Sequence, residues 1–205
     1  TQELFERAEL IEKFTLDKVN SSPASHDPDK LFWIEGEWMK LASMERKVHG
    51  VLPYLVDNGL VAEPLAPQTQ ARIEAVITAL GDRLKVFSDI LNLARYFFTE
   101  TLTFDPDAVK KRLLKDGVPA LLKQLDELLG QVEPFDVPSL EKAIHEFGQS
   151  KAIPMGQIVN PLRVATTGQG VGPGLYDCLA ILGRDTCRAR IAATLDMLAH
   201  STSAN

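Results

Sequence analysis

The sequence predicts an all-α fold, a helical bundle or cage in two lobes. Apolar residues recur at spacings of three and four almost throughout the chain, as in Leu4, Ala8 and Ile11, and this spacing is typical of one helix face. Strict alternation over five or more residues, which is typical of half-buried strands, is nearly absent. With 205 residues, 45% of them apolar, the chain is long enough to bury a core.

Start and stop signals divide the first half into separate helices. Asp27 and Pro28 open one of them, because an aspartate can cap the first turn and a proline needs no N–H there. Pro64 and Pro67 mark a linker. The helices expected here cover 28–41, a segment that ends at Asn58-Gly59, 68–80, and 83–98 after a break at Gly81-Asp82.

The second half is predicted to be a cage of five or six short helices. Asp105-Pro106 caps a basic helix, and Gly117 and Pro119 begin the next one. The remaining helices are expected over 139–147, over a turn that follows Arg163 and ends at Gly168, and over 174–182 with Pro173 at its first turn.

Composition limits the classes of function. The formal net charge of −6 argues against a strongly basic, nonspecific nucleic-acid binder, so any RNA contact must be local. The two cysteines, Cys178 and Cys187, are spaced for helix packing and are interpreted as reduced thiols of an intracellular, cytoplasmic protein. No run of eighteen apolar residues occurs, so we expect no membrane span.

The chain offers few signals for chemistry. The glycine-rich segment from Gly168 to Gly174 lacks a preceding strand and a following Lys-Ser or Lys-Thr pair, so a tight turn between helices is favoured over a phosphate loop. His145-Glu146 begins like a zinc-protease helix, but Gln149 stands where the second histidine belongs. We therefore assign no catalytic residue and no metal ligand.

Cationic and aromatic side chains are the candidates for binding. Arg163 lies close to the glycine-rich turn, where its planar guanidinium can bond a base edge or a phosphate, although a surface salt bridge is the commoner use of such a residue. The same two alternatives, an RNA contact or a surface salt bridge, apply to Arg83. Four cations form a solvated helix face that can also hold a sugar-phosphate backbone: Lys110, Lys111, Arg112 and Lys115. The aromatic rings of Trp33 and Trp38 are interpreted as core anchors.

An ordered series of residues near the end of the chain resembles a known family. The series is Gly156-Gln157, Pro161-Leu162-Arg163, Thr167-Gly168, Pro173-Gly174-Leu175, Leu182-Gly183-Arg184 and Arg190-Ile191. It is similar to the carboxyl-terminal part of bacterial-type glutamyl-tRNA synthetases. Two upstream segments, 14–39 and 94–100, also resemble that family, so the likeness covers the chain from about Glu3 to Leu198.

The resemblance implies a division into three parts and a role in RNA recognition. Residues 1–45 would be the end of a stem-contact domain, and 46–95 and 96–205 two helical anticodon-binding domains. The family's catalytic fold, with its HIGH-like and KMSKS-like signatures, has no counterpart here. We therefore expect this chain to be inactive alone, with ATP, Mg²⁺ and glutamate handled by a catalytic domain of the same polypeptide, and with no cofactor of its own. The family likeness also implies a monomer.

The resemblance also assigns site residues. Arg163 corresponds to an arginine that contacts the anticodon loop, and Pro173 and Leu175 to positions beside the anticodon bases. Gly172 stands where a Thr or Ser is common, so the backbone would replace a hydroxyl contact. Arg83 falls where enzymes that charge only tRNA(Glu) read the third anticodon base, which implies discrimination against tRNA(Gln). The hypothesis requires the two guanidinium groups to converge beside the glycine-rich turn.

Two other classes of function stay open on the sequence. A helical protein-interaction module without RNA binding would present a contiguous exposed apolar patch. A small stand-alone enzyme would present a deep pocket lined with carboxyl groups whose pKa values are strongly shifted.

Overall fold

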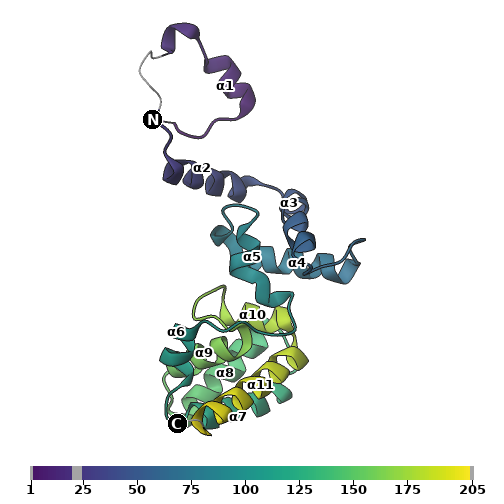
Figure 1. Cartoon of the computed structure of the whole chain (residues 1–205), viewed down its shortest axis with the longest axis vertical. Coiled ribbons are helices and arrows are strands. Elements are labelled where there is room, and N and C mark those ends of the chain that lie inside the picture. The colour runs from purple at the N-terminus through teal and green to yellow at the C-terminus, as the bar shows by residue number, and fades with distance from the viewer. Residues whose placement is uncertain (1, 20–24, 204–205) are drawn as a thin grey trace.

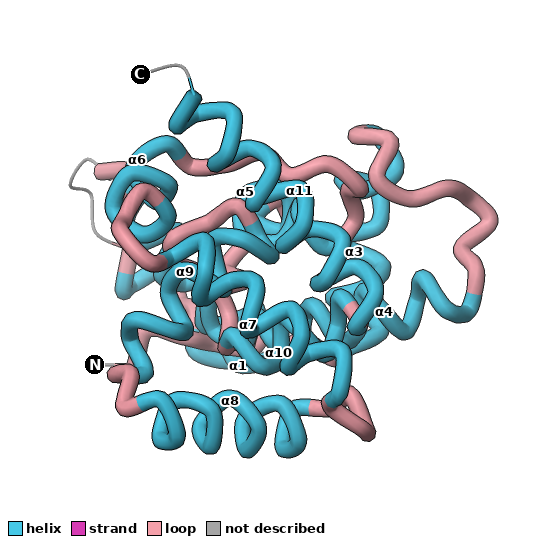
Figure 2. The backbone as a smooth tube through the Cα atoms, turned by 90° about the horizontal axis from the view of Figure 1, so that it is seen from below, coloured by secondary structure: helices cyan, strands magenta, loops and turns pink. Residues whose placement is uncertain are grey.

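The computed structural model describes residues 2–19 and 25–203, and these residues form an elongated stack of helices (Figure 1). In the described residues every regular element is helical, and the tube in Figure 2 carries helix and loop colours only. The all-α prediction is therefore confirmed. Within the same ranges, no helix combines the length and the apolar character that crossing a bilayer requires.

The amino-terminal part consists of α1 (Arg7–Lys13), a 3₁₀ turn (Leu16–Lys18) and α2 (Pro28–Leu41). The predicted start of α2 is confirmed, because the Asp27 carboxylate accepts a hydrogen bond of 3.0 Å from the backbone N–H of Lys30. The prediction that Trp33 and Trp38 are core anchors is wrong. Their side chains are 42% and 39% exposed, since α2 crosses the stack with much of its surface uncovered (Figure 1).

The first lobe contains α3 (Met44–Asp57), α4 (Pro67–Leu80) and α5 (Asp89–Ala94), and α3 packs against both of the others. The predicted helix over 83–98 is wrong. A 3₁₀ turn (Gly81–Arg83) follows α4, and the Asp89 carboxylate then accepts hydrogen bonds from the backbone N–H groups of Lys85 and Val86, at 2.9 and 3.0 Å. These bonds satisfy the backbone of a non-helical turn, and α5 begins at Asp89, six residues later than expected.

The second lobe is the predicted cage. It contains α6 (Pro106–Ala108), a π-helical turn (Val109–Leu113), α7 (Val118–Gln131), α8 (Val137–Lys151), α9 (Met155–Thr167), α10 (Leu175–Leu182) and α11 (Arg184–Ser203). The longest helix, α11, packs against α7, α9 and α10, and α8 covers α10. The prediction that Pro173 lies in the first turn of a helix over 174–182 is wrong: α10 begins at Leu175 with Gly174 as its cap residue, so Pro173 lies just before the helix.

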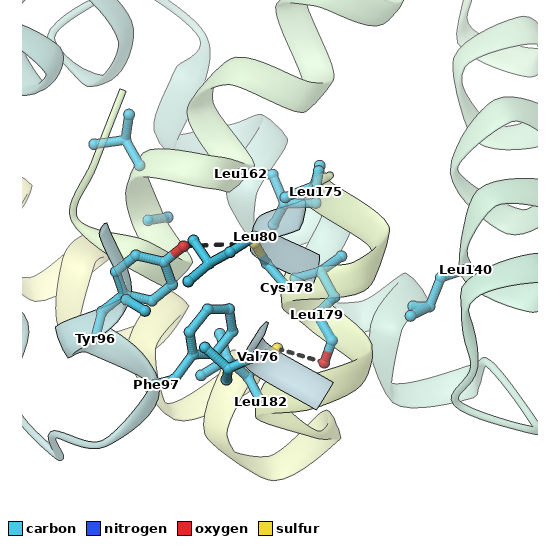
Figure 3. Close-up of a cluster of buried hydrophobic side chains, with 14 of the residues drawn as sticks. Val76, Leu80, Tyr96, Phe97, Leu140, Leu162, Leu175, Cys178, Leu179 and Leu182 are labelled. Atoms are coloured by element: carbon cyan, nitrogen blue, oxygen red, sulfur yellow. Dashed lines mark hydrogen bonds between the residues drawn. The ribbon is translucent and has the colours of Figure 1, made fainter. Parts of the chain in front are cut away.

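The two lobes share one core. Val76 and Leu80 of α4 lie beside Tyr96 and Phe97, and these side chains meet the apolar faces of α9 and α10 in one buried cluster (Figure 3). Both cysteines are buried and unpaired in this cluster, as the spacing predicted. Because α4 packs directly on α10, a rotation of one lobe against the other would expose apolar surface.

Candidate nucleic-acid interface

Arg163 is held against the glycine-rich turn. It lies on α9, which ends when Gly168 adopts a positive φ of 75° and returns its N–H to the Val164 carbonyl oxygen at 2.9 Å. The chain then turns back, and the Arg163 Nη1 donates a hydrogen bond of 2.7 Å to the Pro173 carbonyl oxygen. The side chain is half-buried, and among the described residues it makes no ion pair with a carboxylate. Arg163 is therefore not part of the surface salt bridge that was the alternative.

Gly172 brings the turn close to this guanidinium. A Cβ atom at Gly172 would lie 3.3 Å from the Tyr96 hydroxyl oxygen, which is tighter than ordinary contact, and 3.5 Å from Arg163 Nη1, which is an ordinary contact distance. A side chain here would therefore press on the Tyr96 hydroxyl group. Glycine lets the backbone of the turn lie close to both groups.

The structure buries the side chains of two other predicted residues of the turn, Pro173 and Leu175. Pro173 is buried and Leu175 is only 4% exposed, so both side chains point into the protein. The exposed apolar group of the turn is Val171, at 85%. Sequence analysis missed this residue, although an apolar side chain between two glycines is a signal that could have identified it.

The Tyr96 hydroxyl group lies close to Gly172 of the turn, and sequence analysis missed this residue as well. Its hydroxyl group lies 3.7 Å from the Cys178 sulfur, in the buried cluster that Figure 3 shows. Burial raises the pKa values of both the Tyr96 hydroxyl and the Cys178 thiol. Both groups therefore stay neutral at pH 7, and the charges near them include the guanidinium groups of Arg163 and Arg190.

Arg83 lies elsewhere in the molecule. It is exposed at the end of the 3₁₀ turn Gly81–Arg83, which packs against α2 and α4. None of the described interactions joins Arg83 to Arg163 or to residues 168–174. The two guanidinium groups belong to different lobes, and a ligand that touches both must extend along the molecule.

Part of the predicted cationic face borders a cavity. All four cations are exposed on or just after the π-helical turn: Lys110, Lys111, Arg112 and Lys115. Arg112 and Lys115 also line a cavity of about 580 Å³ between this turn, the start of α7 and the start of α9. Gly156 and Gln157, the first pair in the series that resembles the family, line the same cavity from the start of α9.

Nothing in the described residues favours acid/base or metal chemistry. A hydrogen bond from Lys13 lowers the pKa of the Glu9 carboxyl group, and one from Ser139 lowers the pKa of the Asp136 carboxyl group. Neither carboxyl group lines this cavity. In residues 2–19 and 25–203, no three His, Cys, Asp or Glu side chains lie together in a way that could hold a metal ion.

Known proteins share both the sequence and the fold. The family model described as "Anticodon binding domain" matches residues 47–195. The chain is 32% identical over 190 residues to a glutamate–tRNA ligase of Moorella thermoacetica, covering 93% of this chain and 39% of that protein. A glutamate–tRNA ligase of Herpetosiphon aurantiacus is 34% identical over 202 residues, covering 95% and 39%.

The fold comparison agrees. A crystal structure of a glutamate tRNA ligase from Elizabethkingia meningosepticum superposes with a TM-score of 0.80 at 24% identity, covering 92% of this chain and 36% of that chain. At this identity the likeness concerns the fold alone. The chain thus spans about two-fifths of the relatives that it matches. The resemblance to glutamate–tRNA ligases is confirmed, and because the family model covers most of its length, the chain belongs to the anticodon binding domain family.

Proposed function

We propose that this chain binds the anticodon arm of tRNA(Glu), as the RNA-reading part of a glutamate–tRNA ligase. The attachment of glutamate with ATP and Mg²⁺ belongs, in this proposal, to a part of such an enzyme outside these 205 residues. No residue of the chain is assigned to ATP or Mg²⁺. The contribution of the chain is to hold the RNA loop by shape, charge and base edges.

The observation that carries the proposal is the fixed guanidinium of Arg163. One of its N–H groups is bonded to the Pro173 carbonyl oxygen, so the planar side chain is oriented before any ligand arrives. A half-buried arginine without a carboxylate partner keeps its charge available to a phosphate or a base edge. The exposed Val171 of the glycine-rich turn offers an apolar surface on which an unpaired base can pack.

Local charge reconciles the proposal with a net charge of −6. The cations at Lys110, Lys111, Arg112 and Lys115 are exposed together in the same lobe as Arg163. Single-stranded RNA bound through few phosphates needs such a local cluster, not a basic protein as a whole.

The test is binding of the chain to tRNA(Glu), measured by fluorescence anisotropy at two salt concentrations. Arg163→Ala is expected to weaken binding roughly ten-fold and to make the salt dependence shallower, because a charge-assisted contact is lost. Arg188→Ala is the matched control. It removes the same charge from α11, where Arg188 is paired with Asp126 at 2.9 Å. Equal affinities and salt slopes for the two variants would contradict the proposal.

A second candidate function, contact with another protein surface, is favoured by one observation. Most of the large apolar side chains that are strongly exposed lie in the amino-terminal part, including Ile11, Phe14, Leu16 and Leu41, each at least 66% exposed. Changing Phe14 and Leu16 together to Ser should abolish such a contact and leave tRNA affinity unchanged. Loss of tRNA affinity in that double variant would assign this surface to RNA instead.

A further inference from the structure

The cavity of about 580 Å³ between the π-helical turn and the start of α9 is a built recess with two kinds of wall. Val118, Leu121 and Ile153 contribute apolar surface. Arg112 and Lys115 line it as exposed cations and Asp116 as an exposed carboxylate, so these charged side chains together carry one net positive charge. An apolar slot with positive charge at the mouth matches a nucleotide, whose base is flat and apolar on both faces and whose phosphate is negative.

The α9 wall adds groups that can bond a base edge. Asn160 donates its amide Nδ2 to the Gly156 carbonyl oxygen at 2.6 Å, which fixes the side chain and leaves Oδ1 as an acceptor. Pro161 lies inside α9 and has no N–H, so the helix does not use the carbonyl oxygen of Gln157, four residues earlier. Gln157 itself lines the cavity with an exposed amide.

Gly156 is a glycine that the packing of the chain does not require. A Cβ atom at this position would meet only Asn160 Nδ2, at the ordinary distance of 3.7 Å. Gly156 is the second residue of α9 and also lines the cavity. Because it has no side chain, the backbone of the first α9 turn is open to a ligand there.

The same helix face leads to Arg163. Gly156, Asn160 and Arg163 are spaced by four and three residues and therefore share one face of α9. Seven residues of helix rise roughly 10 Å, which a short stretch of unpaired RNA can span. An RNA loop in contact with Arg163 can thus reach the cavity along this face.

We propose that the cavity takes one unpaired nucleotide of the RNA loop that Arg163 contacts. The base enters between the apolar wall and Gly156, and Arg112 and Lys115 hold the adjoining phosphate. This assignment rests on the proposed tRNA-binding function and adds a second, separate point of contact to it.

The first test is a variant that places a larger side chain in the cavity, at a position on α9. Gly156→Leu places a good helix former at an open position, so the chain should unfold at an unchanged or higher temperature. Binding to tRNA(Glu) should weaken at least five-fold, because one base loses its site. Ala193→Leu on the exposed side of α11 is the control for added apolar surface and should bind like the wild-type chain.

A second variant and a spectroscopic readout make the result independent of folding. Arg112→Ala with Lys115→Ala changes two exposed side chains and should lower the salt slope by about 0.7, the value for one single-strand phosphate. A tRNA with 2-aminopurine at single anticodon-loop positions should show one position whose fluorescence changes on binding wild-type chain but not Gly156→Leu.

The outcomes separate the two proposals. If the wild-type chain does not bind tRNA, both are overturned. If it binds and Arg163→Ala weakens binding, while Gly156→Leu and the double alanine variant match Ala193→Leu, the tRNA-binding function stands and the cavity assignment is overturned.

Discussion

The guanidinium of Arg190 on α11 donates a hydrogen bond of 2.7 Å to the carbonyl oxygen of Tyr96, 94 residues earlier in the chain. Two further bonds go to the carbonyl oxygens of Thr99 and Thr166, at 2.7 and 2.8 Å. The arginine is only 5% exposed and has no carboxylate partner among the described residues. Arg190 therefore links the segment 96–99, which connects the lobes, to the end of α9 through backbone carbonyl oxygens.

Arg190→Met is expected to lower the free energy of unfolding by about 3 kcal/mol, because three buried carbonyl oxygens lose a charged donor. Urea unfolding followed by circular dichroism measures this loss. Arg188→Met, two residues earlier on the same helix, removes a guanidinium bonded to Asp126 at the surface and should have a far smaller effect. Equal losses for the two variants would show that the Arg190 contacts do not stabilise the fold.

Gly168→Ala should destabilise the chain by about 2 kcal/mol or more. The residue has a φ of 75°, and an added Cβ would collide with the Thr103 carbonyl oxygen. Gly117→Ala is the matched control. Its φ of 81° and ψ of −15° match the left-handed backbone of Gly168, but no atom lies within 4 Å of the added Cβ, so only the backbone cost of about 1 kcal/mol is expected. Urea midpoints measured side by side check the difference, and a Gly117→Ala loss as large as that of Gly168→Ala would remove the steric argument.

Stability should fall at alkaline pH, partly through Cys187. Burial raises the pKa of this thiol from 9.0 to about 12 in the folded chain. Below pH 9 the thiol is protonated in both states and its contribution is complete. Between pH 9 and 12 only the unfolded chain loses the proton, so unfolding becomes easier by up to about 1.4 kcal/mol per pH unit.

Cys187→Ala should make this alkaline loss shallower. Unfolding by urea at pH 8, 9.5 and 10.5 compares the two chains. Cys178 supplies a second buried thiol with a raised pKa, so some alkaline sensitivity is expected to remain. An identical pH slope with and without Cys187 would refute the assignment.

Arg83→Gln should reduce the preference of the chain for cytosine over guanine at the third anticodon base of tRNA(Glu), while its stability stays unchanged. The side chain is exposed and contributes little to packing, and a guanidinium distinguishes base edges by its fixed donors. Affinities for tRNA(Glu) and for a transcript with that base changed give the ratio. Arg72→Gln, an exposed arginine on α4, is the control. A ratio that Arg83→Gln leaves unchanged would end the role proposed for this residue.

Helix starts were predictable from short stretches of sequence, since a cap acts within three or four residues. Asp27 before Pro28 and Asp105 before Pro106 each accept a hydrogen bond from a backbone N–H two or three residues on, as their positions predicted. The helix expected from Arg83 does not form, also for a local reason. The Asp89 carboxylate accepts hydrogen bonds from two backbone N–H groups that precede it.

The candidate site was predictable only in part. Arg163 and its nearness to the glycine-rich turn followed from ten residues of sequence, whereas its bond to the Pro173 carbonyl required the turn to fold back over α9. The cavity needs Arg112 and Asn160, 48 positions apart, to face one another across two packed helices.

The sequence by itself determined the helical class, the caps, and the ordered glycines and arginines that mark the family. Only the tertiary structure decided which faces are covered: the rings of Trp33 and Trp38 stay at the surface, and the side chain of Leu175 lies inside. The physical reason is range. Helix formation depends on neighbours within one or two turns, but the burial of a side chain depends on segments that meet it only after the chain has packed.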